Sequence, residues 1–189
     1  MLGLLGFYSE LGDGPDRLTG GPSGSIRDAV RPVAEPDEAE LVAYLDRGHV
    51  LLDVMESAPD VLTGRPHRHS QGCSSLMTDG SWLWRRDFPH YVETHHVALP
   101  EAFVAHVRAL RHQMPTIDVA GFASHYDETM PLVGWSSLVP WRSTAATLVV
   151  EPRTVMSKAE FDAATATEAR ERPSGKWNRP RKQRKPRRI

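Results

Sequence analysis

A histidine-rich loop contains the residues best suited to metal chemistry. In the segment HRHSQGC, His67, His69 and Cys73 place two imidazoles and the only thiol of the chain within seven residues. Imidazole nitrogen and thiolate sulfur are ligands that zinc prefers, so this loop could supply three of its four ligands. The spacing matches no standard zinc finger, and a polar loop without metal explains the same residues. Further histidines follow at His90, His95 and His96.

Motifs for other common chemistries do not match. In HYVETHH, the spacing of His90 and Glu93 differs from H-E-x-x-H, in which two histidines lie four residues apart. The segment GWSSL, residues 134–138, lacks the second glycine of a nucleophile elbow. We recognise no phosphate-binding glycine loop and no calcium loop. The sequence therefore predicts no catalytic residue and no cofactor apart from zinc in the histidine loop.

Charge is distributed unevenly along the 189 residues. Nine of the 23 Lys and Arg residues lie from Arg172 onward and all 24 Asp and Glu residues precede it, so residues 1–171 have a net charge of −10. An acidic body repels nucleic acid and favours neutral ligands or basic protein surfaces. This balance predicts a protein partner for the body.

The C-terminal tail, residues 172–189, has the composition of an arm that binds nucleic acid. Its cations accompany a tryptophan for stacking and prolines that keep the chain extended. Low apolar content and like charges also predict disorder. A tail that folds back on the acidic body, and a solubilising extension without a partner, are alternative interpretations. The candidate nucleic-acid residues are Lys176, Trp177, Arg179, Arg181, Lys182, Arg184, Lys185, Arg187 and Arg188.

The remaining bulk properties are typical of a cytoplasmic protein. The apolar opening MLGLLGF is too short for a signal peptide or a membrane span, and no other stretch approaches 18 uncharged apolar residues. A single cysteine excludes an internal disulfide, which fits a reducing cytoplasm. We therefore expect a cytoplasmic location and no contact with membranes.

Hydrophobic periodicity predicts helices over residues 36–47, 88–96 and 100–112, each with a proline near its first turn. Short strands are expected within residues 3–11 and 49–55. The last part of the body has weaker patterns. Residues 114–141 are expected to be irregular with one or two short strands, residues 145–151 form a strand candidate, and a capping box of Ser157 and Glu160 predicts a C-terminal helix.

The segment LMTDGSWLW, residues 76–84, predicts a hairpin. Asp79-Gly80 is a preferred dipeptide of a two-residue turn, which would place Met77 opposite Trp82. Apolar side chains then alternate between both faces, as in strands covered on both sides. We therefore expect both indoles in the core rather than on a binding platform, and expect Trp82→Ala to destabilise the fold by about 3–5 kcal/mol.

This segment and its flanks resemble a group of small uncharacterised bacterial proteins, mainly actinobacterial, with a pattern close to T-D-G-x-W-x-W, then Y-V, then L-P-x-x-F. The resemblance covers about residues 4–115 and implies a scaffold without assigning any catalytic residue. The matching residues are Thr78, Asp79, Gly80, Trp82, Trp84, Tyr91, Val92, Leu99, Pro100 and Phe103. The residues with a structural role are Asp79, Gly80, Trp82, Trp84, Tyr91, Pro100 and Phe103.

The sequence as a whole predicts a single α+β domain over residues 1–155, followed by a C-terminal helix over 156–171 and the disordered basic tail over 172–189. In the domain, a small antiparallel sheet with a central hairpin is packed by three or four helices. The favoured function is a non-enzymatic cytoplasmic protein-binding module with an immunity-like or regulatory role. The alternatives are a nucleic-acid-associated protein anchored by its tail, and a zinc-dependent enzyme that uses the His/Cys loop.

Deletion of residues 173–189 tests the tail. If the tail is a nucleic-acid arm, the truncated chain will elute from immobilised DNA or RNA at lower salt than the full chain, because each lost phosphate contact removes a salt-dependent contribution to affinity. Equal elution of the two chains would remove the nucleic-acid hypothesis.

Overall fold

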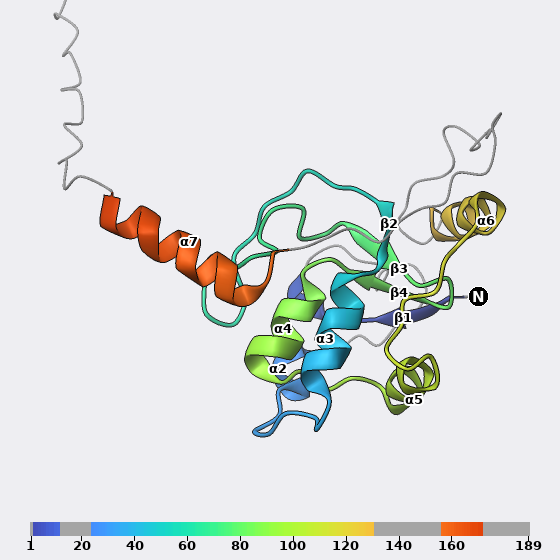
Figure 1. The fold of residues 1–189 in the computed structure, drawn as a ribbon, viewed down its shortest axis with the longest axis horizontal. Helices are drawn as coiled ribbons and strands as arrows, with labels where there is room; N and C mark the ends of the chain where they lie inside the picture. The colour runs from blue at the N-terminus through green and yellow to red at the C-terminus, as the bar shows by residue number, and fades with distance from the viewer. Residues whose placement is uncertain (1, 12–23, 131–155, 172–189) are drawn as a thin grey trace, which may run out of the picture. The chain divides into compact units, whose positions relative to one another are not determined.

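The computed structural model describes residues 2–11, 24–130 and 156–171 of the chain (Figure 1). The chain divides into two compact units, Met1–Met156 and Ser157–Ile189. The predicted strand at 145–151 and the basic tail lie outside the described residues. Among the helices that are described, none is both long and apolar enough to cross a bilayer.

A four-stranded sheet forms the centre of the first unit. Its strands are β1 (Gly3–Leu5), β2 (His49–Leu52), β3 (Leu76–Thr78) and β4 (Trp82–Arg85), in the order β1-β4-β3-β2. The pairs β2–β3 and β3–β4 are antiparallel, whereas β1 runs parallel to β4, so the sheet is mixed. The α+β class predicted from the sequence is confirmed. The prediction of an antiparallel sheet is wrong for the N-terminal strand, because β1 runs parallel to β4.

The β3–β4 hairpin has a longer turn than its dipeptide predicts. Met77 pairs with Trp84 and Thr78 pairs with Leu83, so the register differs by two residues from the predicted one. The Asp79 carboxylate is the cause, because its Oδ1 accepts the amides of Ser81 at 2.8 Å and of Trp82 at 2.7 Å and draws both residues into the turn. Side chains alternate with period two, so this shift leaves every side chain on its predicted face.

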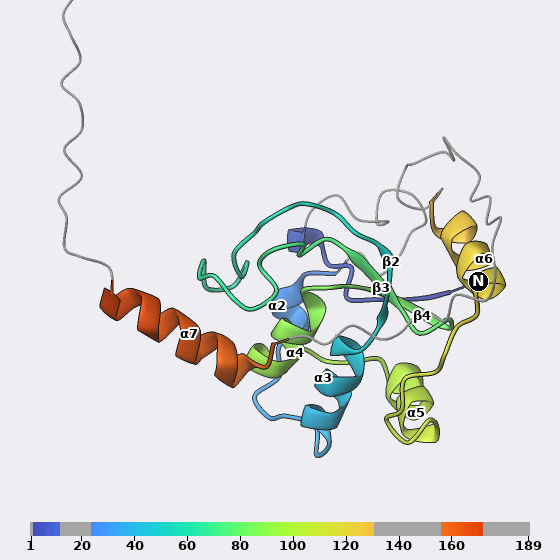
Figure 2. The ribbon, with the colours of Figure 1, turned by 45° about the horizontal axis from the view of Figure 1, so that its top comes forward.

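Helices cover the face of the sheet that carries Met77 and Trp84 (Figures 1 and 2). The N-terminal segment adds a short 3-10 turn, η1 (Ser9–Leu11), and α2 (Ile26–Ala29). The three predicted helices are present as α3 (Glu38–Asp46), α4 (Phe88–His95) and α5 (Glu101–Ala109). In both views α3 and α4 lie side by side, and their apolar stripes join that of α5 in one buried cluster.

The opposite face is covered by a helix that the sequence pattern did not predict. α6 (Val119–Thr129) lies within the stretch expected to be irregular, and its Phe122 and Tyr126 pack against the second apolar cluster of the sheet. The prediction of irregular structure for residues 119–129 is wrong, because a glycine such as Gly121 lowers helix propensity but does not prevent a capped helix. Asp118 caps this helix by accepting the Gly121 amide at 2.7 Å, which satisfies a free donor of the first turn.

Trp84 is the largest fully buried side chain of the described core. Its Nε1 donates to the carbonyl of Leu45 at 3.2 Å, and Phe103 meets its ring edge to face. A Cβ atom at Gly48 would collide with this indole, so the glycine allows close approach of the backbone. Trp82 is only half-buried, against Phe103 and Gly3. The expectation of two indoles in the core therefore holds in full for Trp84 and in part for Trp82.

The second unit contains α7 (Lys158–Glu171). The predicted capping box begins it: the Glu160 amide donates to Ser157 Oγ at 3.3 Å, and the Ser157 amide donates to the Glu160 carboxylate at 2.8 Å. These reciprocal bonds satisfy two amides at the start of the helix.

We expect Trp84→Ala to lower the free energy of unfolding by about 3–5 kcal/mol, because it leaves a cavity in the core. Trp82→Ala is expected to cost about 1–3 kcal/mol, because part of this indole already contacts water. Urea denaturation of the two variants and the wild type measures both values. A larger loss for Trp82→Ala than for Trp84→Ala would contradict the observed burial.

Candidate functional site

The structure does not gather the predicted metal ligands His67, His69 and Cys73. All three are buried, but within the described ranges their donor atoms do not meet as a group. His69 Nε2 pairs with Asp46 at 2.9 Å. Burial raises the pKa of the Cys73 thiol.

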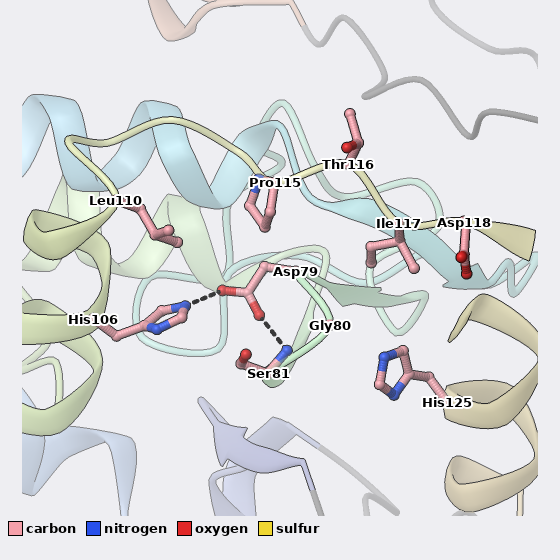
Figure 3. A pocket seen from close by; sticks show the side chains of 10 residues that line it. All are labelled: Asp79, Gly80, Ser81, His106, Leu110, Pro115, Thr116, Ile117, Asp118 and His125. Carbon is pink, nitrogen blue, oxygen red and sulfur yellow. Dashed lines mark hydrogen bonds and ion pairs between the residues drawn. The ribbon is translucent and has the colours of Figure 1, made fainter. Parts of the chain in front are cut away.

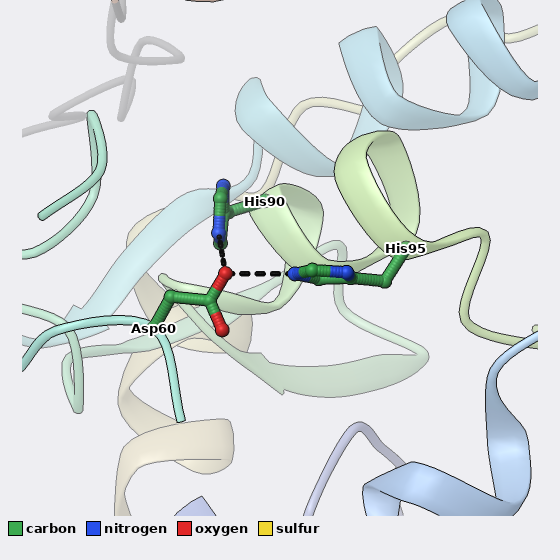
Figure 4. A group of neighbouring side chains, drawn as sticks. All are labelled: Asp60, His90 and His95. Carbon is green, nitrogen blue, oxygen red and sulfur yellow. Dashed lines mark hydrogen bonds and ion pairs between the residues drawn. The ribbon is translucent and has the colours of Figure 1, made fainter. Parts of the chain in front are cut away.

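A different set of donors converges between α4 and the loop that follows β2 (Figure 4). The Asp60 Oδ2 atom accepts hydrogen bonds from His90 Nε2 at 2.9 Å and from His95 Nε2 at 2.7 Å. Among the described residues this is the one group of three His, Cys, Asp or Glu donors within 4.8 Å of one another. We call it the Asp60 cluster.

The backbone holds Asp60 in place for both imidazoles. Its Oδ1 accepts the amides of Leu62 at 2.7 Å and Thr63 at 3.2 Å, so the loop turns around this carboxylate. Burial alone would raise the pKa of Asp60, but the hydrogen bonds from His95 and His90 outweigh it and hold the pKa well below its usual range. Asp60 is therefore an anion at neutral pH, and it is almost completely buried.

His67 completes the surroundings of this cluster. Its ring stacks on His90 with 4.0 Å between centroids, and its Nε2 is buried without a hydrogen-bond partner. Burial, with smaller effects from His90 and His69, lowers the pKa of His67 to about 3. His67 is therefore a neutral imidazole with an unused nitrogen.

Ion pairs surround the cluster on the side of α3. Arg68 bonds Asp46 at 2.6 Å and Glu93 at 3.3 Å, and only 3% of its side chain is exposed. Because His69 bonds the other oxygen of Asp46, the loop of residues 67–69 is fixed to both α3 and α4. The histidine-rich loop is thus a packed element of the domain.

A second polar site lines an open hollow of about 560 Å³ at the β3–β4 turn (Figure 3). Asp79, Gly80 and Ser81 form its floor, and His106 of α5 and His125 of α6 lie on two sides. Apolar contacts come from Leu110 and Ile117 in its wall. Gly80 has a φ of +90°, which an L-residue rarely adopts.

Asp79 accepts from four donors and has no exposed side-chain surface. Its Oδ2 accepts from Tyr44 Oη at 2.7 Å and His106 Nε2 at 2.9 Å, while Oδ1 accepts the two turn amides. Burial, together with the hydrogen bond to Asp79, raises the pKa of Tyr44 well above its usual range. The carboxylate is saturated, so its arrangement is that of a structural anion rather than of a free general base.

A third surface combines exposed apolar and charged groups. The segment Asp53–Ser57 follows β2 and faces Gln71, Gly72 and Arg86 across a hollow of about 510 Å³. Met55 is fully exposed there, between the exposed acidic residues Asp53 and Glu56. We call this the Met55 surface.

The remaining predicted residues are placed as follows. Tyr91 is buried and its hydroxyl accepts the Val61 amide at 3.1 Å, Pro100 precedes α5 as its N-cap, and Phe103 is completely buried. Asp87 is the N-cap residue of α4 but makes no capping hydrogen bond, because its carboxylate binds the Arg85 guanidinium at 3.0 and 2.8 Å. The nucleic-acid residues of the tail lie outside the described residues.

Sequence reasoning missed Asp60 as a ligand partner. The histidines of HYVETHH were visible, but Asp60 lies 30 residues earlier than His90 and carries no motif. His90 and His95 are five residues apart, which is no standard ligand spacing. The density of histidines near the end of one helix was the available signal.

Comparisons with known proteins give no information on function, so the function must be argued from this geometry. No family model, no curated protein and no solved structure matches the chain.

We expect Asp79→Asn to lower the free energy of unfolding by about 1–3 kcal/mol, because an amide cannot accept from all four donors and leaves a buried one unpaired. Asp28→Asn, at an exposed position of α2, is the matched control and should change stability by less than about 0.5 kcal/mol. Urea denaturation at neutral pH measures both. Equal small effects would show that the four-donor arrangement does not support the turn.

Proposed function

We propose that the chain is a non-enzymatic protein-binding module that docks a basic partner protein on its Met55 surface. The observation that carries the proposal is the complete exposure of Met55 between two acidic side chains beside a hollow. Methionine is flexible and polarisable and is common at surfaces that bind other proteins.

The backbone around Met55 is held in place, so its exposure is a feature of an ordered segment. The Gly72 amide donates to the Glu56 carbonyl at 2.7 Å, and the Ala58 amide donates to the Ser70 carbonyl at 3.1 Å. On the other side, the Val54 amide donates to Ser75 Oγ at 3.0 Å. A prepared surface loses little conformational entropy on binding, which favours affinity.

Charge supports a basic partner. The exposed carboxylates of Asp53 and Glu56 flank Met55, and residues 1–171 have a net charge of −10. Complementary charge steers association and excludes acidic competitors. A thioether with flanking carboxylates suits a partner surface that combines an apolar pocket with Lys or Arg.

The polar clusters support binding rather than catalysis. The carboxylates of Asp60 and Asp79 each accept from four donors, and Asp87 is engaged by Arg85. An acid–base catalyst needs a group that reaches the substrate, and these three carboxylates are turned inward. The single free, buried cysteine supports a cytoplasmic location for this module. Its proposed role there is inhibitory or regulatory.

Comparative affinity capture tests the proposal. The wild type, Met55→Asp and Glu56→Lys are immobilised and exposed to extract from the native host, and retained proteins are quantified by mass spectrometry. Loss of an interface hot spot costs about 2 kcal/mol or more, and about 1.4 kcal/mol is already tenfold in affinity, so we expect a specific partner to fall about tenfold or more with both variants.

Val33→Asp is the matched control, because Val33 is 71% exposed and lies outside the Met55 surface. It should retain the partner as the wild type does, and raising the salt concentration should weaken capture by the wild type. A profile of retained proteins that is the same for all four baits would refute the proposal.

A further inference from the structure

We propose that Asp60, His90 and His95 bind a divalent transition-metal ion, with zinc as the preferred ion. The site is formed by α4 and the loop that follows β2, it shares no residue with the Met55 surface, and it does not depend on the proposed function. It also differs from the set His67, His69 and Cys73 that the sequence suggests.

Two of the three separations between ligand atoms are close to those of a tetrahedral site. Zinc bonds of about 2.0–2.1 Å place neighbouring ligand atoms ~3.3 Å apart. In the Asp60 cluster, Oδ2 lies 2.9 Å from His90 Nε2 and 2.7 Å from His95 Nε2. The side chains need to separate by only a few tenths of an ångström for an ion to replace the two hydrogen bonds.

The chemistry of the donors fits the ion. Two neutral imidazoles and one carboxylate form a ligand set used by zinc, and they leave one position for water. Binding requires the proton of each Nε2 to move to Nδ1 or to leave. For His90 a hydrogen-bond partner is in place. When the proton is on Nδ1, this nitrogen can donate a hydrogen bond to Thr94 Oγ1, which lies 3.2 Å away. Such outer hydrogen bonds orient metal ligands.

Asp60 can hold an ion without losing its structural role. Its Oδ1 remains bonded to the amides of Leu62 and Thr63, while Oδ2 faces the two imidazoles. The carboxylate is therefore oriented before any ion binds. This arrangement removes part of the entropy cost of assembling the site.

The ring of His67 covers His90 on one side of the cluster. It is buried and stacks on His90, and its Nδ1 accepts the His69 amide at 3.3 Å. In the neutral ring the proton is therefore on Nε2, so His67 is not a fourth ligand. The fourth position is left to water, as in open zinc sites.

Metal titration of the full-length, tag-free chain tests the proposal. The protein is treated with a chelator, dialysed and titrated with Zn²⁺, and bound metal is measured by elemental analysis after equilibrium dialysis. We expect one equivalent to bind. Co²⁺ should give the visible absorption of a tetrahedral site, and Zn²⁺ should displace it.

Ligand variants identify the site. Asp60→Asn and His95→Gln are each expected to weaken Zn²⁺ binding by at least about tenfold, and Thr94→Val should weaken it to a smaller degree. Circular dichroism verifies that each variant is folded. Thr94→Val leaves all three ligands in place and so keeps the test informative if a ligand variant does not fold.

Three controls separate this site from other sources of binding. His112→Gln removes an imidazole that pairs with Asp37 elsewhere in the domain, and it should bind Zn²⁺ as the wild type does. Cys73→Ala should also leave binding unchanged, whereas a site at His67, His69 and Cys73 would lose it. Met55→Asp should bind Zn²⁺ normally even where it loses the protein partner.

Substoichiometric Zn²⁺ in the folded wild type would overturn the proposal. An equal loss of affinity with His112→Gln and His95→Gln would overturn it as well, because it would assign the binding to scattered surface histidines.

Discussion

The buried carboxylate of Asp79 joins three elements of the first unit. Its four hydrogen bonds come from the β3–β4 turn, from Tyr44 on α3 and from His106 on α5. A buried anion is tolerated only when donors replace the water that it has lost, so these elements must meet at this point. The turn then sets the hairpin register, and the register places Trp84 beneath α3 and α5. The packing of the main core depends on this one saturated group.

Pairs of a histidine with an Asp or Glu carboxylate recur through the domain. No lysine occurs before Lys158, and six of the nine histidines contact an Asp or Glu side chain. Histidine here shares with arginine the pairing that lysine also performs in many proteins. Because one imidazole N–H occupies only one of the acceptor sites of a carboxylate, Asp60 and Asp79 accept backbone amides as well. In the Asp60 cluster a single carboxylate oxygen accepts hydrogen bonds from two imidazoles. The other paired carboxylates of the described residues each bond only one imidazole.

The Met55 surface has a different character from both clusters. Asp53 and Glu56 accept the hydroxyls of Ser75 and Ser74, yet both side chains are exposed and they flank the fully exposed Met55. Removing an exposed apolar group from water is favourable, so burying Met55 against a partner would contribute to binding. The molecule thus separates its polar interior, which supports the fold and contains the proposed cation site, from the surface that we propose for a partner.

Local patterns were sufficient for most of the fold. Proline and acidic residues near their starts, with apolar residues at helical spacing, identified α3, α4 and α5, and the alternation around Trp84 assigned both faces of the hairpin correctly. α6 was missed because a glycine near a helix start resembles a break until its amide is seen to be capped by Asp118. The parallel strand β1 was not indicated as such, because a three-residue strand carries no information about the direction of its neighbour.

The sequence by itself determined most of the elements and their buried faces, because periodicity and capping act over a few residues. Only the tertiary structure decided which donors meet. His67, His69 and Cys73 are close in sequence, yet they point to different partners, whereas Asp60 reaches His90 and His95 from 30 and 35 residues away. The physical reason is that a ligand or ion-pair site requires convergence of side-chain atoms to within a few ångströms. That convergence is set by how helices and loops pack, and packing is a property of the whole chain.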